Sequence, residues 1–284
     1  MSASTDTPSP LQPPDIVRRN LQFSFDDVER HWFAGDCHRT RLFDALSLFF
    51  PEGERFFIES VKHYRPRLPA RGLLSAQVDD FIAQEAYHSR EHRRYKAWLE
   101  SQGIDTQRLD AATAQRLDQL RDTTRPSQRL AITICLEHFT AILADQVLRN
   151  DRLLAGAHPQ MRRLWRWHAL EETEHKAVAF DVYEAALGRH WRSWLLRCVS
   201  MLSVTMYFCG FAWLHLIHFV RRDGQSSKLR GWLGLLRYMF VTPGPFLRVL
   251  PAWLAWFKPG FHPWQHDNQA LIEQARREDG LATV

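Results

Sequence analysis

The chain has 284 residues, and 45% of them are hydrophobic, so it can bury a sizeable core. Its 37 Lys and Arg residues outnumber its 32 Asp and Glu residues, which gives a formal charge of +5. Because the chain has no dense basic run interleaved with aromatic residues, we expect no nucleic-acid partner. The four cysteines form no CxxC pair, which is typical of a reducing compartment. The start, from Met1 to about Pro14, lacks the apolar run of a signal peptide, so we expect a disordered tail and a cytoplasmic protein.

Helical periodicity dominates the rest of the chain, and alternating strand-like runs are missing, which predicts an all-α protein. We expect a helical bundle over residues 15–190 and further apolar helices over residues 191–284. The second predicted helix has Ser75 as its N-cap and stops before Gly103, and the fourth begins at Pro159 and stops at Gly188. The four predicted bundle helices cover residues 39–64 (with a kink or restart at Pro51), 75–101, 126–149 and 159–188.

Carboxylates interrupt the apolar stripe of each predicted helix. The stripes carry Glu54 in the first helix, Glu85 in the second, Glu137 in the third and Glu172 in the fourth. A glutamate is almost never fully buried unless it is paired, so four of them in one core would be destabilising without a positive partner. Metal ions among the four side chains would remove that cost.

The histidine spacing supports a metal site. Glu85 and His88 form one Glu-x-x-His unit, and Glu172 and His175 form a second one 87 residues later. Residues i and i+3 project from one face of a helix, so each unit can hold a metal ion. One Glu from each of two helices and one Glu-x-x-His from each of the other two is the ligand pattern of ferritin-like di-iron proteins. We therefore predict a ferritin-like four-helix bundle with a di-metal centre.

Several residues compete with these ligands in the first two helices. Glu52 and Glu59 are alternatives to Glu54, which we prefer because it lies one turn before Phe57. Glu91 is expected to face solvent. His92 falls on the stripe and is expected to be a partner of a ligand or a hydrogen-bonded core residue, with direct ligation as a third possibility.

The third and fourth helices leave similar choices. His138 is expected to be structural, and Glu174 to lie on the surface beside Lys176. Glu171 is the rival of Glu172, which we prefer because it alone completes the spacing with His175. His168 lies one turn before Glu172, either as a third imidazole ligand or as a core histidine. The predicted metal ligands are thus Glu54, Glu85, His88, Glu137, His168, Glu172 and His175.

The C-terminal third is strongly apolar. Residues 198–220 contain no Asp, Glu, Lys or Arg, a length that could span a bilayer. The alternatives are a helix packed across the bundle and a peripheral contact with the inner face of the membrane. Asp181 is expected to form a salt bridge or to orient a ligand. His262 and His266 are expected to be turn and packing residues, with a substrate entrance or a surface metal site as alternatives. Residues 268–279 predict a short polar helix.

Four blocks of the sequence resemble a bacterial family known as predicted metal-dependent hydrolases. They are Phe50-Pro-Glu-Gly-Glu-Arg-Phe-Phe57, Gln84-Glu-Ala-Tyr-His-Ser-Arg-Glu-His92, Leu136-Glu-His-Phe-Thr-Ala141 and the run from Trp165 to Asp181. The resemblance extends from about residue 20 to the block ending at His266, and it implies a metal. The place of His168 is also similar to that of a third ligand histidine in the di-iron arylamine N-oxygenases, a likeness of ligand pattern alone.

Ligands of carboxylate and imidazole without thiolate favour two iron ions, with manganese as an alternative. We expect an oxidase or oxygenase that uses O2 on a small-molecule, lipophilic substrate, with an electron donor that the sequence does not identify. No catalytic residue beyond the ligands is predicted. The alternatives are a metal-dependent hydrolase, in which zinc would fit, and a non-enzymatic metal-binding protein.

Overall fold

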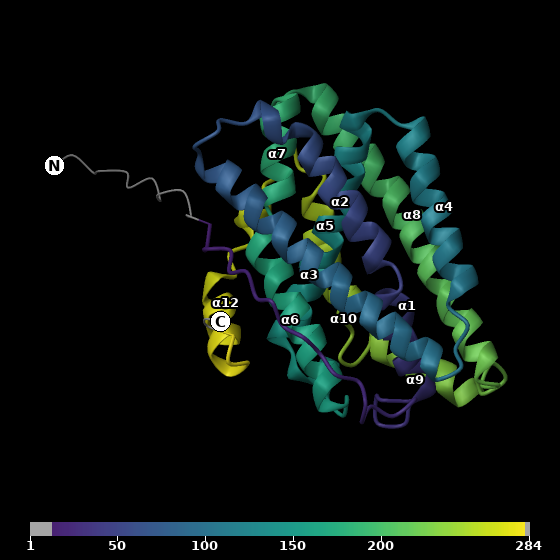
Figure 1. Cartoon of the computed structure of the whole chain (residues 1–284). Helices are drawn as coiled ribbons and strands as arrows, with labels where there is room; N and C mark the ends of the chain where they lie inside the picture. Colours follow the sequence, from purple (N-terminus) through teal and green to yellow (C-terminus); the bar gives the residue numbers. More distant parts are fainter. Residues whose placement is uncertain (1–12, 282–284) are drawn as a thin grey trace.

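The computed structural model describes residues 13–281, and these residues form an all-helical fold (Figure 1). The predicted disordered tail, Met1 to Pro14, lies almost entirely outside the described residues. The proposed division into domains stays a prediction. The described helices of eight or more residues are α1 (Cys37–Ser47), α2 (Phe50–Tyr64), α3 (Leu73–Ser101), α4 (Gln107–Thr123), α5 (Pro126–Arg149), α6 (Pro159–His175), α7 (Val178–Leu187), α8 (Trp191–Arg222), α9 (Leu229–Phe240) and α12 (Gln269–Glu278). The short helices α10 (Pro245–Arg248) and α11 (Leu250–Ala255) lie between the last two.

A bundle of α2, α3, α5 and the consecutive pair α6 and α7 forms the centre of the molecule. α2 packs against α3, α5 packs against α6, and further contacts join α2 to α5 and α3 to α6 and α7. In Figure 1, α4 and α8 flank this bundle on one side and α12 lies on the other. The residues before α1 form an extended segment that runs along the bundle and ends near α1.

The predicted helices match the observed ones with three differences. α5 has the predicted bounds, Pro126 being its first residue. The restart expected at Pro51 in the first helix is confirmed, since α2 begins at Phe50, whereas the fourth predicted helix is broken after His175 before α7 begins. The prediction of Ser75 as an N-cap was wrong: the N-cap of α3 is Gly72, and the Ser75 hydroxyl instead donates to the Pro69 carbonyl. Helix α4 was not among the predicted elements.

Two apolar clusters divide the core along the length of the bundle. One contains Tyr95 and Leu99 of α3 with Leu164 of α6. The other contains Phe81 of α3 and Ile134 of α5 together with residues of α7. On α3 the predicted ligands Glu85 and His88 fall between these clusters, after Phe81 and before Tyr95. The apolar packing therefore encloses them on both sides along the bundle.

Helix α8 packs lengthwise on the bundle. It contacts α1 and α5, and the segment after it returns to α5 through α10 and α11. By length and composition alone, α5 and α8 could each cross a membrane; the apolar window of α5 is 67% buried, whereas that of α8 is 28% buried. The predicted polar C-terminal helix is present as α12.

Candidate metal centre

The structure brings all seven predicted ligand residues together inside the bundle. Glu54 comes from α2, Glu85 and His88 from α3, Glu137 from α5, and the remaining three from α6. None of the seven exposes more than 3% of its surface. Their side chains converge because each lies mid-stripe on a helix whose flanking turns are apolar.

The candidate ligand atoms form overlapping groups in which the atoms lie within 4.8 Å of one another. One group joins Glu85 and Glu137 to His175. Other groups join Glu54 and Glu85 to His88, and His88 to His168 and Glu172. Glu172 faces both sides: its Oε1 lies 3.1 Å from His168 Nε2, and its Oε2 lies 3.6 Å from His175 Nε2. Glu85 and Glu172 thus lie between His175 on one side and His88 and His168 on the other.

These residues fit a metal site by their chemistry, because their polar atoms lack other partners. Both carboxylate oxygens of Glu54, Glu85 and Glu137 are buried without a hydrogen bond, as is Nε2 of His175. Buried groups of this kind are expensive unless a partner is supplied. Burial raises the pKa of Glu54 well above its usual range, and the neighbouring Glu85 raises it further. A cation held among these oxygens would supply the missing partner.

Neighbouring side chains orient two of the candidate ligand histidines. His175 Nδ1 lies 2.7 Å from Gln84 Oε1, which leaves Nε2 directed at Glu85, 3.1 Å away. The Nε2 atom of His88 lies 3.1 Å from Glu171 Oε2, and its Nδ1 faces Glu172 at 3.6 Å. A carboxylate or amide oxygen on one ring nitrogen fixes the tautomer in which the other nitrogen can bind a metal.

His168 is oriented by a second histidine. Its Nδ1 lies 3.0 Å from His92 Nε2, and His92 Nδ1 lies 2.8 Å from the Ser47 hydroxyl of α1. Burial lowers the pKa of His168 to about 4, and the nearby His88 adds to this effect. His92 therefore contacts a candidate ligand, as expected, although its own ring also comes within the 4.8 Å group of Glu54 and His168.

Two predictions about acidic residues were wrong. Glu174 was expected on the surface, but it is buried and ion-paired to Arg19 at 2.7 Å and to Arg276 at 2.7 Å. Glu91 was expected in solvent, but it is also buried and accepts a hydrogen bond from the Phe23 backbone N–H at 2.9 Å. In both cases the N-terminal segment covers a helix face that would otherwise be exposed. The pattern of apolar residues within one helix cannot predict that another segment covers it.

The other rivals lie outside the groups of candidate ligand atoms. Glu171 accepts from Trp167 Nε1 at 2.9 Å and lies 3.3 Å from Arg19, so it supports the site from behind His88. Glu59, half-exposed at 46% of its side chain, pairs with Arg55 and Arg121, and Glu52 pairs with Arg55.

Three residues outside the centre have structural partners. His138 donates to the Ala252 carbonyl at 3.2 Å, which confirms its structural role. Asp181 pairs with His262 at 2.8 Å, and His266 pairs with Asp145 at 3.2 Å. Asp181 thus forms the side-chain pair expected for it, with His262 as the partner. His262 and His266 both have partners within the fold.

A further cluster of possible ligands, His31, Cys37 and Asp223, lies at the end of α8. Asp223 is already paired to Arg41 at 2.6 Å and to Arg30. Two guanidinium groups on one carboxylate leave no need for a cation, so this cluster is an ion-pair network that ties α8 to the N-terminal segment.

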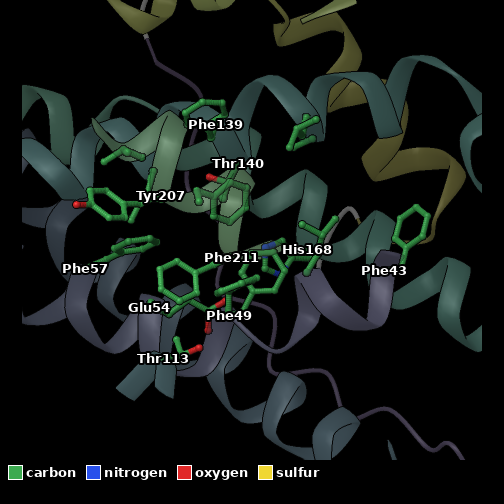
Figure 2. Close-up of a pocket in the computed structure, with 18 of the residues that line it drawn as sticks. Phe43, Phe49, Glu54, Phe57, Thr113, Phe139, Thr140, His168, Tyr207 and Phe211 are labelled. Atoms are coloured by element: carbon green, nitrogen blue, oxygen red, sulfur yellow. The ribbon is translucent and has the colours of Figure 1, made fainter. Parts of the chain in front are cut away.

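An apolar cavity of about 300 Å³ adjoins the candidate metal centre. Figure 2 shows Glu54 and His168 among its lining residues, with the rings of Phe49, Phe57 and Phe211 nearby. The remaining lining comes from α1, α4, α5, α8, α9 and α10 and is almost entirely apolar. A cavity of this size and composition suits an apolar ligand whose polar group meets the two site residues.

Sequence reasoning missed the residues that support the ligands. Gln84 precedes Glu85 and Ser47 lies on a separate helix, while Arg19 lies in a segment without regular structure. Only the position of Gln84, beside a predicted ligand, offered a signal. The contacts of Ser47 and Arg19 span 45 and more than 150 residues of chain, which no local pattern encodes.

Comparisons with known proteins yield one family. A family model described as "Predicted metal-dependent hydrolase" matches residues 17–267. No curated protein and no solved structure gives a significant match. The match covers the whole bundle, all seven candidate ligands and the apolar helices after α7. By this match the chain belongs to the predicted metal-dependent hydrolase family.

Proposed function

We propose that the chain is a di-metal enzyme of ferritin-like type that hydrolyses a lipophilic substrate. One observation carries the proposal: Glu54 and His168 belong both to the groups of candidate ligand atoms and to the lining of the apolar cavity. A substrate in that cavity would place its polar group beside the metal ions. The family description supports hydrolysis over other reactions of such a centre.

The proposed ligands divide into two sets. Glu54, His88 and His168 would hold metal at one end of the site and Glu137 and His175 at the other, and Glu85 and Glu172 lie close to the histidines of both ends. When bound, two ions lower the pKa of a water molecule and polarise a scissile ester or amide group. Zinc, manganese and iron all accept this mixture of carboxylate and imidazole ligands.

The chain's own residues bind and orient in this proposal. The cavity wall holds the apolar part of the substrate and excludes bulk water. The hydrogen-bonded series from Ser47 through His92 fixes the ring of His168, while Gln84 fixes that of His175. In hydrolysis, water adds to the acyl carbon, the bond to the leaving group breaks, and the proton from water ends on the leaving group.

Oxidation by O2 is a second candidate. Two features favour it. The candidate ligands are carboxylates and imidazoles without thiolate, a set that suits iron. The apolar cavity at Glu54 would shelter a reactive oxygen species from water. In this case the ions would be iron, and the substrate would be oxidised rather than cleaved. Two electrons from an external donor would be needed for each oxygen atom inserted.

The test is metal loading followed by paired assays. The purified protein is stripped of metal and reloaded with Zn²⁺, Mn²⁺ or, without air, Fe²⁺; elemental analysis is expected to give two ions per chain. Hydrolysis is then measured on p-nitrophenyl esters of increasing acyl length, and O2 uptake is measured with an electrode. Ester cleavage by the Zn²⁺ or Mn²⁺ protein supports the hydrolase, whereas O2 uptake restricted to the Fe²⁺ protein supports the second candidate.

Matched glutamate variants control this test. Glu54→Gln is expected to lose metal and activity together, whereas Glu52→Gln, on the same helix but paired to Arg55 outside the centre, is expected to keep both. One ion or none per wild-type chain would contradict the di-metal proposal.

A further inference from the structure

The exposed apolar side chains of this protein gather on its C-terminal helices. Over residues 13–281, seventeen large hydrophobic residues are exposed, and all but Leu73 lie between Trp191 and Leu254. Scattered single residues of this kind are normal on a soluble protein, but a concentration in one region indicates an interaction surface.

The exposed residues of α8 follow one stripe. Trp191, Leu195, Val199, Leu202 and Met206 recur at spacings of three and four, with exposed fractions from 45% to 74%. This spacing places them on one face of the helix. The buried residues of α8, Met201 and Leu216 among them, lie off this stripe and point into the molecule.

The shorter helices beside α8 repeat the pattern. On α9 the exposed stripe consists of Leu229, Leu233, Leu236 and Phe240, opposite the buried Leu235 and Met239. On α10 and α11 it continues through Leu247, Leu250 and Leu254.

Two contacts hold these helices against α8. Trp213 of α8 meets Trp232 of α9 with ring centroids 6.2 Å apart, and Trp253 of α11 donates to Thr205 of α8 at 3.1 Å. The exposed residues of α8, α9, α10 and α11 are called the apolar face below.

The stretch of chain that carries the apolar face is rich in basic residues. Residues 185–266 contain ten Lys and Arg but one acidic residue, Asp223, a formal charge of +9; because the whole chain carries +5, the remainder carries −4. Asp223 is itself neutralised by Arg41. Nine of the ten basic residues are exposed, Arg197 being buried, and they include Arg192 and Arg221 near the two ends of α8. Arg189 pairs with Glu184 and Arg222 with Asp105, so seven of the nine lie outside such pairs among the described residues.

We propose that the apolar face docks on an anionic lipid bilayer, with α8 and α9 lying in the plane of the membrane. Apolar stripes bordered by Lys and Arg, with tryptophans among them, are the signature of interfacial helices. Negatively charged headgroups match the charge of +9. A second copy that met this face with its own would bring the same excess of basic residues, so charge complementarity favours an anionic surface.

A membrane-spanning α8 is disfavoured by its neighbours. The helix packs along α1 and α5, and Arg116 of α4 lies over the ring of Tyr207, 4.9 Å from its centroid. α4 is rich in charged residues, and only Thr113 is buried among its seventeen. If α8 crossed the bilayer, these charges would enter hydrocarbon, which is costly.

The cavity shares lining residues with the helices of the apolar face. Ser203 and Tyr207 of α8 are exposed and also line the cavity, and Phe246 beside the exposed Leu247 lines it too. A lipophilic molecule could therefore pass from the bilayer toward Glu54 and His168 without crossing water. This last step rests on the proposed function, whereas the docking itself does not.

The test is co-sedimentation of the full chain with vesicles. We expect binding to vesicles of phosphatidylcholine and phosphatidylglycerol in equal parts, weaker binding to phosphatidylcholine alone, and weakening by salt. Leu202→Ser and Leu233→Ser are each expected to reduce the affinity about tenfold, from the apolar area lost to the bilayer. Leu73→Ser, at a leucine outside the face that is more exposed than either of these, is expected to leave the affinity unchanged.

Two outcomes would overturn the proposal. One is equal binding by Leu233→Ser, Leu73→Ser and wild type when circular dichroism shows all three folded. The other is a dimer in light scattering that Leu233→Ser converts to monomer while vesicles bind nothing, which would assign the face to a second copy. Neither outcome depends on metal or activity, so the proposed function would survive both.

Trypsin treatment of protein bound outside sealed vesicles tests the in-plane arrangement. Arg192 and Arg221 lie at opposite ends of α8, so both ends are expected to remain equally open to cleavage when lipid is added. Protection of one end alone would indicate a helix that crosses the bilayer and would overturn the arrangement.

Discussion

Gln84 and His175 form a hydrogen bond of 2.7 Å between Oε1 and Nδ1, across two helices of the bundle. Because an amide oxygen only accepts, Nδ1 carries a proton, and Nε2 is the nitrogen that faces Glu85 and Glu137. The amide nitrogen of Gln84 in turn donates to Glu174 at 3.0 Å, which keeps the amide from flipping. The ring is thus set for metal binding by a residue that does not bind the metal.

Replacing Gln84 by alanine is expected to weaken metal binding about 10- to 100-fold, the usual cost of losing such a partner. The fold is expected to persist, since Gln84 lies in the middle of α3, where alanine is a good helix former. Competition with a chelator of known affinity measures the change. Gln77→Ala, on the same helix and half-buried outside the centre, is the control; equal loss in both variants would contradict the role of Gln84.

Glu54→Gln is expected to stabilise the metal-free protein while abolishing metal binding. The buried carboxyl has no hydrogen-bond partner, and burial raises its pKa, with Glu85 raising it further. The unfolded chain releases this proton near pH 4.3, whereas the folded protein retains it to higher pH. Wild-type stability from this group is therefore complete below pH 4.3 and is lost as pH rises.

The measurement is the free energy of unfolding of both proteins without metal, from pH 4 to pH 8. The advantage of Glu54→Gln is expected to grow with pH and to reach about 1–3 kcal/mol. With metal bound to the wild type the order is expected to reverse, because metal binding requires the ionised ligand. A difference between the two proteins that does not change with pH would refute this account of Glu54.

Arg19 and Arg18 provide a matched pair of ion-pair variants. Arg19 is buried against Glu174 and Glu171, with no exposed side-chain surface on any of the three. Its removal breaks two buried ion pairs and leaves Glu174 with Arg276 as its guanidinium partner and Glu171 with the Trp167 indole, so Arg19→Ala is expected to cost about 3–5 kcal/mol of unfolding free energy.

Arg18 pairs with Asp80 at the surface, with 49% of its side chain exposed, so Arg18→Ala is expected to cost less than about 1 kcal/mol. Urea unfolding followed by circular dichroism compares the two variants. If they were equally stable, the extended segment at Arg19 would not hold the bundle together as the contacts indicate.

The sequence predicted the centre far better than its surroundings. Glu54, Glu85, Glu137 and Glu172 could be found because each interrupts an apolar stripe within its own helix, and helical spacing is a local signal. Glu91 and Glu174 were misplaced because an extended segment about 70 to 155 residues away in sequence covers them. Likewise, the break after His175 has no proline or glycine to announce it.

Two glycines of α9 test how tightly the apolar face is attached to the bundle. A Cβ at Gly231 would lie 2.2 Å from His38 Cε1 of α1, whereas a Cβ at Gly234 would meet nothing within 4 Å. His38 is buried and its ring packs edge-on against Trp232, so it cannot move aside freely. Gly231→Ala is therefore expected to destabilise the protein by about 1–3 kcal/mol, as overpacking does.

Gly234→Ala is expected to stabilise the protein by about 0.5–1 kcal/mol, because alanine favours a helix over glycine. Thermal unfolding of both variants beside the wild type gives the answer, and a stabilising Gly231→Ala would mean that α9 does not pack on His38.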